Sequence, residues 1–326
     1  MPKRTISDIS QLIDDDLKLF NELFKQSLKS KVALVDLITR YILKQKGKKV
    51  RPLLVLLSSK ISGGITERSY RGAILVELLH TATLVHDDVV DNAETRRNFP
   101  SINAVWKNKI AVLMGDYLLA RGLTQAVDGS DYDFLKVITN TVKRMSEGEL
   151  LQSSKTRKLD NDEETYFKII SDKTASLLST CCEIGARAST DDEEKISAMK
   201  EYGENLGIAF QIRDDILDYV GTRTLLGKPL GGDIKEKKIT LPLIYALKNS
   251  QTDAAKRIIK NLKSGEKKID VNMVIEFTKN NGGIEYSEKA AKEYSETAKQ
   301  KLSLFPDSEY KSALIDLASF VVERTK

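Results

Sequence analysis

Apolar side chains in this chain recur mostly every three or four residues, which is the spacing of one face of a helix. Two stretches show this spacing most clearly, at residues 75–90 and 137–145. Runs of alternating Val, Ile and Thr, which indicate strands, are almost absent, and no Asn-Gly or Asp-Gly turn stands between alternating apolar runs. The pattern predicts an all-α fold with about a dozen helices.

The breaks in this pattern are short and local. Residues 62–64 and 128–130 contain Gly and are expected to be loops, and residues 190–193 are expected to begin a helix with acids in its first turn. The one long irregular segment of the second half is Gly-Lys-Pro-Leu-Gly-Gly-Asp at residues 227–233. No stretch has the composition of a flexible linker. We therefore expect a single domain over residues 1–326, a large helical bundle around a central catalytic cavity, because facing helices of a bundle can build a site from distant segments.

Two acidic clusters of the same shape lie on the predicted helices. Carboxylates at positions i and i+4 lie one above the other on a helix face, so their charges repel unless a cation separates them. A single cluster would be explained most simply as a solvated acidic patch, but the apolar flanks and the second copy favour two acidic walls across a cavity, with divalent metal between them. The clusters consist of Asp87, Asp88 and Asp91, and of Asp214, Asp215 and Asp218.

Other polar residues share the faces of these clusters. His80 and Thr83 lie on the face of the first cluster, and Gln211 lies on that of the second, where the adjacent Arg213 is expected to help neutralise the acids. For His80, a hydrogen-bonded core histidine is an equally good interpretation. Because the candidate ligands are carboxylates and the whole chain has only 2 His, a hard cation such as magnesium is favoured, and magnesium usually bridges carboxylates to substrate phosphates.

Basic side chains accompany the acidic clusters. A Lys or Arg pair is usually only a solvated surface, but several groups beside acidic clusters and a Gly-rich segment suit an anion that carries several phosphates. Neither a Walker A sequence nor Gly-x-Gly-x-x-Gly is present, so ATP and NAD have no support. The groups are Lys48 and Arg51, Arg96 and Arg97, and Lys228 and Lys238.

The residues indicate electrostatic catalysis and no covalent nucleophile. No Ser lies in a Gly-x-Ser-x-Gly turn, and the adjacent Cys181 and Cys182 have no partner His. The chemistry expected is heterolysis of a C–O bond to diphosphate, with metal ions and cationic side chains stabilising the leaving group. A carbocation would result, so the rest of the cavity should be apolar.

Composition restricts the class of protein and its cellular location but does not decide the chemistry. The chain has 326 residues, is 41% hydrophobic and 30% charged, and carries a net charge of +5, which does not by itself imply nucleic acid. The N-terminus does not have the pattern of a signal peptide, and the longest apolar run, at residues 53–57, is far too short to span a bilayer. The two Cys are best explained as small buried hydrophobes. We expect a cytoplasmic protein with no nucleic-acid partner and no transmembrane segment.

The motifs in this order resemble those of the trans-isoprenyl diphosphate synthases, the polyprenyl synthetases. The resemblance covers residues 46–242, about 60% of the chain, from Lys-Gly-Lys-Lys-Val-Arg-Pro at residues 46–52 to the segment after the second acidic cluster. Departures are small: Lys46 stands where the family often has Gly, and Lys49 stands where it often has Arg. The resemblance implies an all-α bundle around a central cavity, usually as a homodimer.

The resemblance also implies a role for each matching residue. Isopentenyl diphosphate would be bound by Lys48, Arg51, His80 and Arg97. Magnesium, about three ions per site, would be held on the allylic diphosphate, which is farnesyl or geranyl diphosphate, by Asp87, Asp88, Asp91 and Asp214, with Asp215 and Asp218 in support. The allylic diphosphate would be contacted by Arg96, Lys173, Lys228 and Lys238, while Thr174 and Gln211 would direct oxygen dipoles towards the cation.

Product length is expected to depend on Ala82 and Thr83, which in the family form a floor under the growing chain. Neither is aromatic, so the tunnel should stay open to a product of about C30 to C40, of the kind found in quinone side chains. Geranylgeranyl or farnesyl diphosphate synthesis is the alternative. A terpene cyclase and a non-catalytic subunit of a heteromeric synthase also remain open, although a cyclase usually lacks the second full acidic cluster and a non-catalytic subunit is expected to lose Asp residues.

Overall fold

The computed structural model describes residues 4–45, 47, 49–96, 99–158, 162–221, 230–250, 252–263 and 270–324. The expected all-α fold is confirmed, and the only strands among these residues form a two-residue pair, β1 (Thr95–Arg96) and β2 (Phe99–Pro100). The N-terminal half contains α1 (Ile6–Gln11), α2 (Asp14–Ser27), α3 (Ala33–Lys44), α4 (Val50–Ser62), α5 (Glu67–Val90), α6 (Ile102–Asp128) and α7 (Tyr132–Lys158).

The C-terminal half is also helical. After α8 (Glu163–Ile170) comes a π-helical turn, η1 (Ser171–Ala175), which leads directly into α9 (Ser176–Arg187). The remaining elements are α10 (Glu193–Val220), α12 (Gly232–Lys235), α13 (Leu241–Lys248), α14 (Asp253–Lys263), α15 (Val271–Asn280), α16 (Gly283–Lys301), the 3₁₀ turn η2 (Leu302–Leu304) and α17 (Glu309–Glu323).

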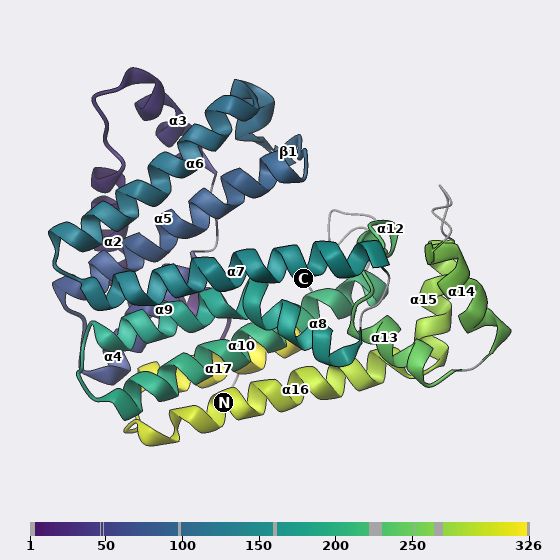
Figure 1. The fold of residues 1–326 in the computed structure, drawn as a ribbon. Coiled ribbons are helices and arrows are strands. Elements are labelled where there is room, and N and C mark those ends of the chain that lie inside the picture. Colours follow the sequence, from purple (N-terminus) through teal and green to yellow (C-terminus); the bar gives the residue numbers. More distant parts are fainter. Residues whose placement is uncertain are drawn as a thin grey trace.

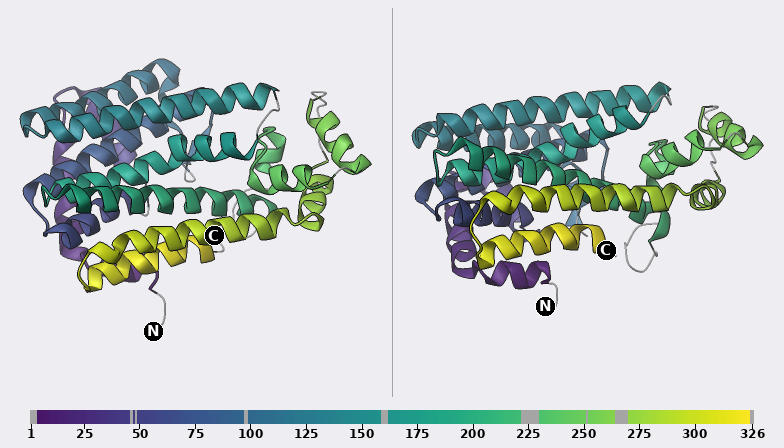
Figure 2. Two further views of the ribbon diagram at one scale, coloured as in Figure 1. Left: turned by 60° about the horizontal axis from the view of Figure 1, so that its bottom comes forward. Right: turned by 90° about the horizontal axis from the view of Figure 1, so that it is seen from below.

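The long helices lie side by side in layers (Figure 1). Helices α5 and α6 pack together at one side, α4, α7 and α9 follow, and α10 lies between α9 and the pair α16 and α17. Figure 2 shows α13, α14 and α15 gathered at one end of the bundle. Helix α10 contacts α9, η1, α13, α16 and α17, so it connects the layers, and it is the helix that carries the second acidic cluster.

Several sequence expectations about helix ends are confirmed. Residues 62–64 and 128–130 end α4 and α6, and Asp192 caps α10 by accepting from the backbone N–H groups of Glu194 and Lys195. A side-chain cap satisfies N–H groups that have no partner inside the helix. The predicted registers at residues 75–90 and 137–145 lie within α5 and α7.

The core is built where helices approach closely. Gly185 of α9 faces the backbone of α4, since an added Cβ would lie 2.3 Å from the Val55 carbonyl oxygen. Cys181 and Cys182, on the same helix, are fully buried, as the sequence suggested, and burial raises the pKa of both thiols. Among the described helices, none has the length and apolarity needed to cross a membrane.

Candidate active site

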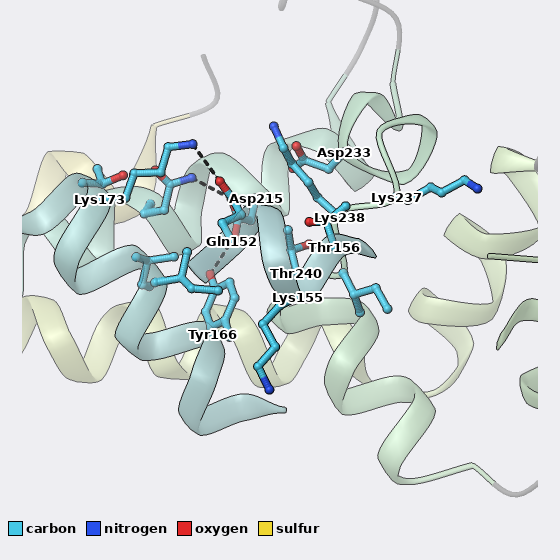
Figure 3. Close-up of a pocket in the computed structure, with 15 residues that line it drawn as sticks. Gln152, Lys155, Thr156, Tyr166, Lys173, Asp215, Asp233, Lys237, Lys238 and Thr240 are labelled. Carbon is cyan, nitrogen blue, oxygen red and sulfur yellow. Dashed lines mark hydrogen bonds between the residues drawn. The ribbon is translucent and has the colours of Figure 1, made fainter. Parts of the chain in front are cut away.

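A polar cavity between α7, α8, η1, α10 and the segment after α12 gathers five of the predicted site residues (Figure 3). They come from three separate stretches of the chain, as expected for a site built in a helical bundle. The five are Lys173, Thr174, Gln211, Asp215 and Lys238. The cavity is also lined by Gln152, Lys155, Thr156, Tyr166, Asp233, Lys237 and Thr240, none of which the sequence analysis had selected.

A chain of hydrogen bonds runs along one wall of this cavity. The Thr174 hydroxyl donates to Gln211 Oε1 at 2.9 Å, and Gln211 Nε2 donates to Asp215 Oδ1 at 2.8 Å. The Tyr166 hydroxyl donates to the other oxygen of Asp215 at 2.7 Å (Figure 3). The predicted spacing of Gln211 and Asp215, one helical turn apart, therefore produces a direct contact, and η1 and α8 each supply a further polar partner.

Lys173 lies at the edge of the same cavity. Its Nζ donates to Gln152 Oε1 at 2.7 Å and lies 2.5 Å from Glu149 Oε2, both on α7. Lys155 and Lys237 also line the cavity, but Figure 3 shows them pointing away from this group. Lys173 is thus held by polar side chains beside the buried acids.

Two carboxyl groups that line this cavity have raised pKa values. Asp215 is only 4% exposed, and burial, together with the nearby charge of Asp233, raises its pKa to about 8. Burial and the charge of Asp218 raise the pKa of Asp233 to about 6. Carboxyl groups with pKa values raised this far by desolvation and by neighbouring acids are common at functional sites.

The members of the second cluster have distinct environments, although they lie on one face of α10. Asp218 accepts from the backbone N–H groups of Gly232 and Asp233, both at 3.0 Å, and so fixes the start of α12. Asp214 is paired with Arg324, whose guanidinium also stacks on the ring of Phe210 at 4.1 Å. Only Asp215 lines the cavity itself.

The expected role of Arg213 is wrong. Its Nε donates to the backbone carbonyl of Arg324 at 2.9 Å, and a terminal nitrogen lies 3.6 Å from Glu288 on α16. Because α10 turns this side chain towards α16 and α17, it does not pair with the acids of its own helix. Arg324, far away in the sequence, pairs with Asp214 instead.

The three acids of the first cluster also differ in burial and in their partners. Asp88 is 3% exposed and accepts from Arg96 of β1, with N–O distances of 2.7 and 2.6 Å, whereas Asp87 and Asp91 remain open to solvent. Burial of its surroundings nevertheless raises the pKa of Asp87, and the charge of Lys173 opposes that rise. The first cluster therefore lies within electrostatic range of the cavity that holds the second.

The two acidic clusters are connected by basic residues. The charge of Asp87 acts on both Lys173 and Arg96, and that of Asp91 acts on Lys238. Lys238 also interacts with Asp233 in the main cavity. Lys173 and Lys238 are therefore near acids of both clusters, whereas the predicted divalent metal between two acidic walls stays a prediction.

A second cavity, of about 450 Å³, lies between α2, α3 and α5. His80, Asp88 and Arg96 line it, together with Lys49, whose Nζ is bonded to Asn21 on α2. Desolvation lowers the pKa of Lys49, which is the residue that differs from the family's usual Arg. The volume lies within the range of small-molecule sites. A small ligand with negative charge therefore suits this cavity.

Other predicted residues lie elsewhere. Arg51 of α4 lines neither cavity, Ala82 is buried in the core at 2% exposure, and Thr83 donates its hydroxyl to the His80 carbonyl. His86 turns away from its neighbour Asp87, with Nε2 lying 3.1 Å from the Val112 carbonyl oxygen on α6. Three predicted residues lie outside the described part of the chain, namely Lys48, Arg97 and Lys228.

The acidic residues fit magnesium in the form in which enzymes usually hold it. Within the described ranges, no group of three or more His, Cys, Asp or Glu side chains is close enough to enclose an ion. Magnesium is commonly bound by one or two carboxylates while substrate phosphates supply the other oxygens. The carboxylates of the two acidic clusters, on α5 and α10, are ligands of this kind.

Comparison with known proteins agrees with the geometry. Residues 32–277 match the polyprenyl synthetase family. The chain belongs to this family. Among curated relatives, an all-trans-nonaprenyl-diphosphate synthase described as geranyl-diphosphate specific, from Rhodobacter capsulatus, is 36% identical over 318 residues, which are 97% of each chain. A geranylgeranyl diphosphate synthase from Saccharolobus solfataricus is also 36% identical, over 330 residues, and covers 96% of this chain and 99% of its own.

Solved structures of this polyprenyl synthetase family have the same fold. A decaprenyl diphosphate synthase from Rhodobacter capsulatus superimposes with a TM-score of 0.92 at 33% identity and covers 99% of this chain and all of its own. A polyprenyl synthase from Caulobacter crescentus, in complex with calcium and isoprenyl diphosphate, has a TM-score of 0.91 at 31% identity, with 100% of both chains covered.

The cavity residues that were not predicted differ in how strong a signal the sequence gives for them. Asp233 ends the Gly-rich segment at residues 227–233 and could have been recognised there as a further acid beside the two clusters. Glu149 and Gln152 lie three residues apart on α7, a spacing common on any polar helix face. Tyr166 gave no signal in the sequence, because its role depends on a partner on another helix, Asp215.

Proposed function

We propose that this polyprenyl synthetase is a chain-elongating prenyltransferase that condenses isopentenyl diphosphate with an allylic diphosphate to give an all-trans polyprenyl diphosphate. The observation that carries the proposal is the single cavity that joins Lys173, Thr174, Gln211, Asp215 and Lys238. Asp215 of the second acidic cluster lines this cavity, and Asp87 and Asp91 of the first cluster interact electrostatically with its Lys173 and Lys238. The family match and the names of its relatives support the same reaction.

In the proposed reaction the allylic diphosphate binds beside the acidic walls, where Lys173 and Lys238 contact its oxygens. Magnesium, held by Asp87, Asp88, Asp91 and Asp214, would neutralise the diphosphate and so make it a better leaving group. The count of about three ions per site is part of the proposal. Asp215 and Asp218 would support these ligands, held in place by the hydrogen bonds that they accept from Tyr166 and from the N–H of Asp233.

The polar wall would stabilise positive charge on the allylic carbon. Gln211 Oε1 accepts from Thr174, and this fixes the direction in which the amide oxygen points. An oriented oxygen dipole stabilises a developing cation without needing to reorganise during the reaction. The released diphosphate is the proposed base for the final proton, consistent with the absence of a His among the residues that line the cavity.

We propose that isopentenyl diphosphate occupies the second cavity, beside the first acidic cluster. His80, Arg96 and Lys49 line it. Arg51, which lines neither cavity, and Lys48 and Arg97, which lie outside the described residues, remain predicted contacts of this substrate. The nucleophilic double bond would then approach the allylic carbon from the side of α5. Asp87, whose charge acts on residues of both cavities, lies between the two binding sites.

The proposed product is about C30 to C40, because Ala82 and Thr83 are small and leave room past the floor position. The geranylgeranyl diphosphate synthase from Saccharolobus solfataricus, as similar to this chain as the nonaprenyl relative, keeps a C20 product as the second candidate. A cytoplasmic location and a homodimer are also proposed. The dimer is favoured by apolar side chains exposed along α6, namely Val105, Val112 and Leu113, which are 40–55% exposed.

Incubation of the pure protein with magnesium, farnesyl diphosphate and labelled isopentenyl diphosphate tests the proposal. Chromatography of the dephosphorylated product would show elongated all-trans prenols of about C30 to C40. A cyclised hydrocarbon would favour a cyclase, and the absence of extension would refute the synthase function. A product of C20 would refute the chain length while leaving the reaction intact.

A further inference from the structure

The polar wall of the active site depends on an irregular turn. Lys173 and Thr174 lie in η1, the π-helical turn between α8 and α9, in which the Ser176 N–H bonds to the carbonyl of Ser171, five residues back. A π-helical turn holds more residues than an α-helical turn, and such turns occur mostly as single insertions, often at functional sites. The sequence neighbours of Lys173 and Thr174 must therefore hold this turn in place.

Asp172, which comes just before Lys173, faces a separate polar cluster. Its Oδ1 accepts from Arg144 Nε at 2.8 Å, and its Oδ2 accepts from Lys168 at 3.1 Å. Arg144, on α7, also donates to the Ser171 hydroxyl at 2.9 Å and to Glu204 of α10 at 2.8 Å. One guanidinium thus joins two residues of η1 to two neighbouring helices.

The cluster is closed by its other members. The Ser171 hydroxyl donates to Glu204 at 2.5 Å, and the Ser176 hydroxyl donates to the backbone carbonyl of Asp172 at 2.6 Å. Asp172 is 8% exposed, and its charge and that of Glu204 are balanced by Arg144 and Lys168. A buried carboxylate that is fully paired in this way fixes the orientation of the turn, because any rotation of the turn would leave the carboxylate without its partners.

Two glycines bring α7 and α10 up against the same turn. A Cβ added to Gly148 would lie 3.0 Å from both Asp172 Cβ and the Lys173 nitrogen, and one added to Gly207 would lie 2.5 Å from the Cα of Ala175. The turn is therefore enclosed from both sides by close backbone approaches, while Arg144 fixes its rotation through directional bonds. These contacts involve none of the residues that line the active-site cavity except Lys173.

We propose that Arg144, Asp172 and Glu204 form a positioning cluster that holds η1 so that Lys173 and Thr174 both face the allylic diphosphate. The inference rests on the proposed function, since it assigns these two residues to that substrate. If the turn relaxed to α-helical geometry, the helix on one side of it would rotate by about 100° relative to the helix on the other side, which is the angle of one α-helical residue. Lys173 would then leave Gln152, and Thr174 would leave Gln211.

The test compares Asp172→Asn, Arg144→Met and the double variant with the unchanged protein. We expect kcat/KM for farnesyl diphosphate to fall by about 10- to 100-fold in each single variant, because small displacements of positioned groups are costly to the rate. KM for isopentenyl diphosphate should stay within about 2-fold, since no residue of η1 lines its proposed cavity. The double variant should be no worse than the worse single variant, because both remove one shared interaction.

Arg187 provides the matched control. It pairs with Glu183 at 3.0 Å on the same helix, α9, and with Glu193 at 3.0 Å, but lies outside the cavities that hold the site. Arg187→Ala should lower the melting temperature without changing either substrate constant. If circular dichroism shows that Asp172→Asn does not fold, Glu204→Gln replaces it. This variant should show a smaller fall in kcat/KM for farnesyl diphosphate, again with little change in KM for isopentenyl diphosphate.

Unchanged allylic kinetics in a folded variant would overturn the inference. So would an equal effect on both substrates, additive losses in the double variant, or the same kinetic change in Arg187→Ala. A wild-type protein that extends farnesyl diphosphate while the variants also do so normally would refute only the positioning cluster. A wild-type protein without extension would refute the proposed function, and the inference with it.

Discussion

Individual carboxylates in this protein have unlike environments although their sequence context is nearly the same. Asp215 is buried between Tyr166 and Gln211, whereas Asp218 accepts from two backbone N–H groups and Asp214 from Arg324. The sequence predicted which residues are acidic and which helix face they share. It could not predict their partners, because Tyr166 and Arg324 reach the face from distant segments.

The buried carboxyl of Asp215 should make the metal-free protein less stable as pH rises. Its pKa of about 8 in the folded protein exceeds the ordinary value, so between those two pH values the unfolded chain loses this proton while the folded protein keeps it. The free energy of unfolding should then fall by at most about 1.4 kcal/mol per pH unit from this group. Below pH 4 the contribution is fully present, and above about 8 it is fully lost.

Thermal denaturation of the wild type and of Asp215→Asn, in EDTA between pH 5 and 8, checks this expectation. Asn cannot ionise, so its melting temperature should decline less with pH, and the variant should be the more stable of the two near pH 8. Parallel curves would contradict the assigned pKa. Prenyl elongation should fall by at least about 100-fold in the variant at any pH in this range.

Thr83 is the better of the two proposed floor residues for changing product length. Ala82 is 2% exposed in the core, so a large side chain there would overpack α5 and cost about 1–3 kcal/mol. Thr83 is only partly buried. Thr83→Phe should shorten the main product by at least one five-carbon unit, as measured by chromatography of the prenols. An unchanged product would place the floor deeper, and Thr83→Ser, with a small side chain, serves as the control.

At the level of elements, the apolar pattern predicted the long helices and their ends well. It predicted α5, α7 and the start of α10 because helical spacing, Gly-containing loops and an Asp cap are local signals. It did not predict η1, since a single added residue scarcely disturbs the pattern around Lys173 and Thr174. It also gave no indication that α7 and α10 approach that turn through glycines.

Gly207→Ala tests the close approach of α10 to η1. The added Cβ would lie 2.5 Å from the Cα of Ala175, which is backbone and cannot turn aside, so the helices must separate. We expect a loss of about 1–3 kcal/mol in the free energy of unfolding. Allylic kcat/KM should fall as well, because Gln211 lies one turn further along α10.

Gly203→Ala provides the comparison. Its added Cβ would lie 2.6 Å from the carbonyl oxygen of Leu178 on α9, so it would separate α10 from α9 away from the cavity. It should lower stability by a similar amount while leaving a larger share of the allylic activity. Urea denaturation and steady-state kinetics measure the two effects separately. Equal kinetic losses in both variants would show that the approach to η1 has no special role.

On the scale of the whole molecule, one cavity is lined by α7, α8, η1 and α10 and a second by α2, α3 and α5, and we propose that each holds one of two anionic substrates. The sequence predicted the acids and bases that surround them, and the family match confirms the fold. It could not show which basic residue faces which cavity, because that depends on how α5 packs on α4, α6 and α9. The expectations of one domain over residues 1–326 and of a homodimer stay predictions.

The proposed dimer predicts a change of assembly on altering the exposed face of α6. Leu113 is 55% exposed, and Leu113→Glu should weaken association by introducing charges that face each other across a twofold interface. Sedimentation should show a dimer for the wild type and a shift towards monomer for the variant. A monomeric wild type would refute the dimer. Leu150→Glu, on the 71% exposed Leu150 of α7, is the control and should not change the assembly.

The two adjacent cysteines have a practical consequence for spectroscopy. Cys181 and Cys182 are fully buried within α9 and burial raises the pKa of each thiol, so at neutral pH they should react slowly with maleimides. A single cysteine introduced at a solvent-exposed position could therefore be labelled selectively in the otherwise native chain. Paired labels across α5 and α10 would report the distance between the two acidic walls as magnesium and diphosphate are added.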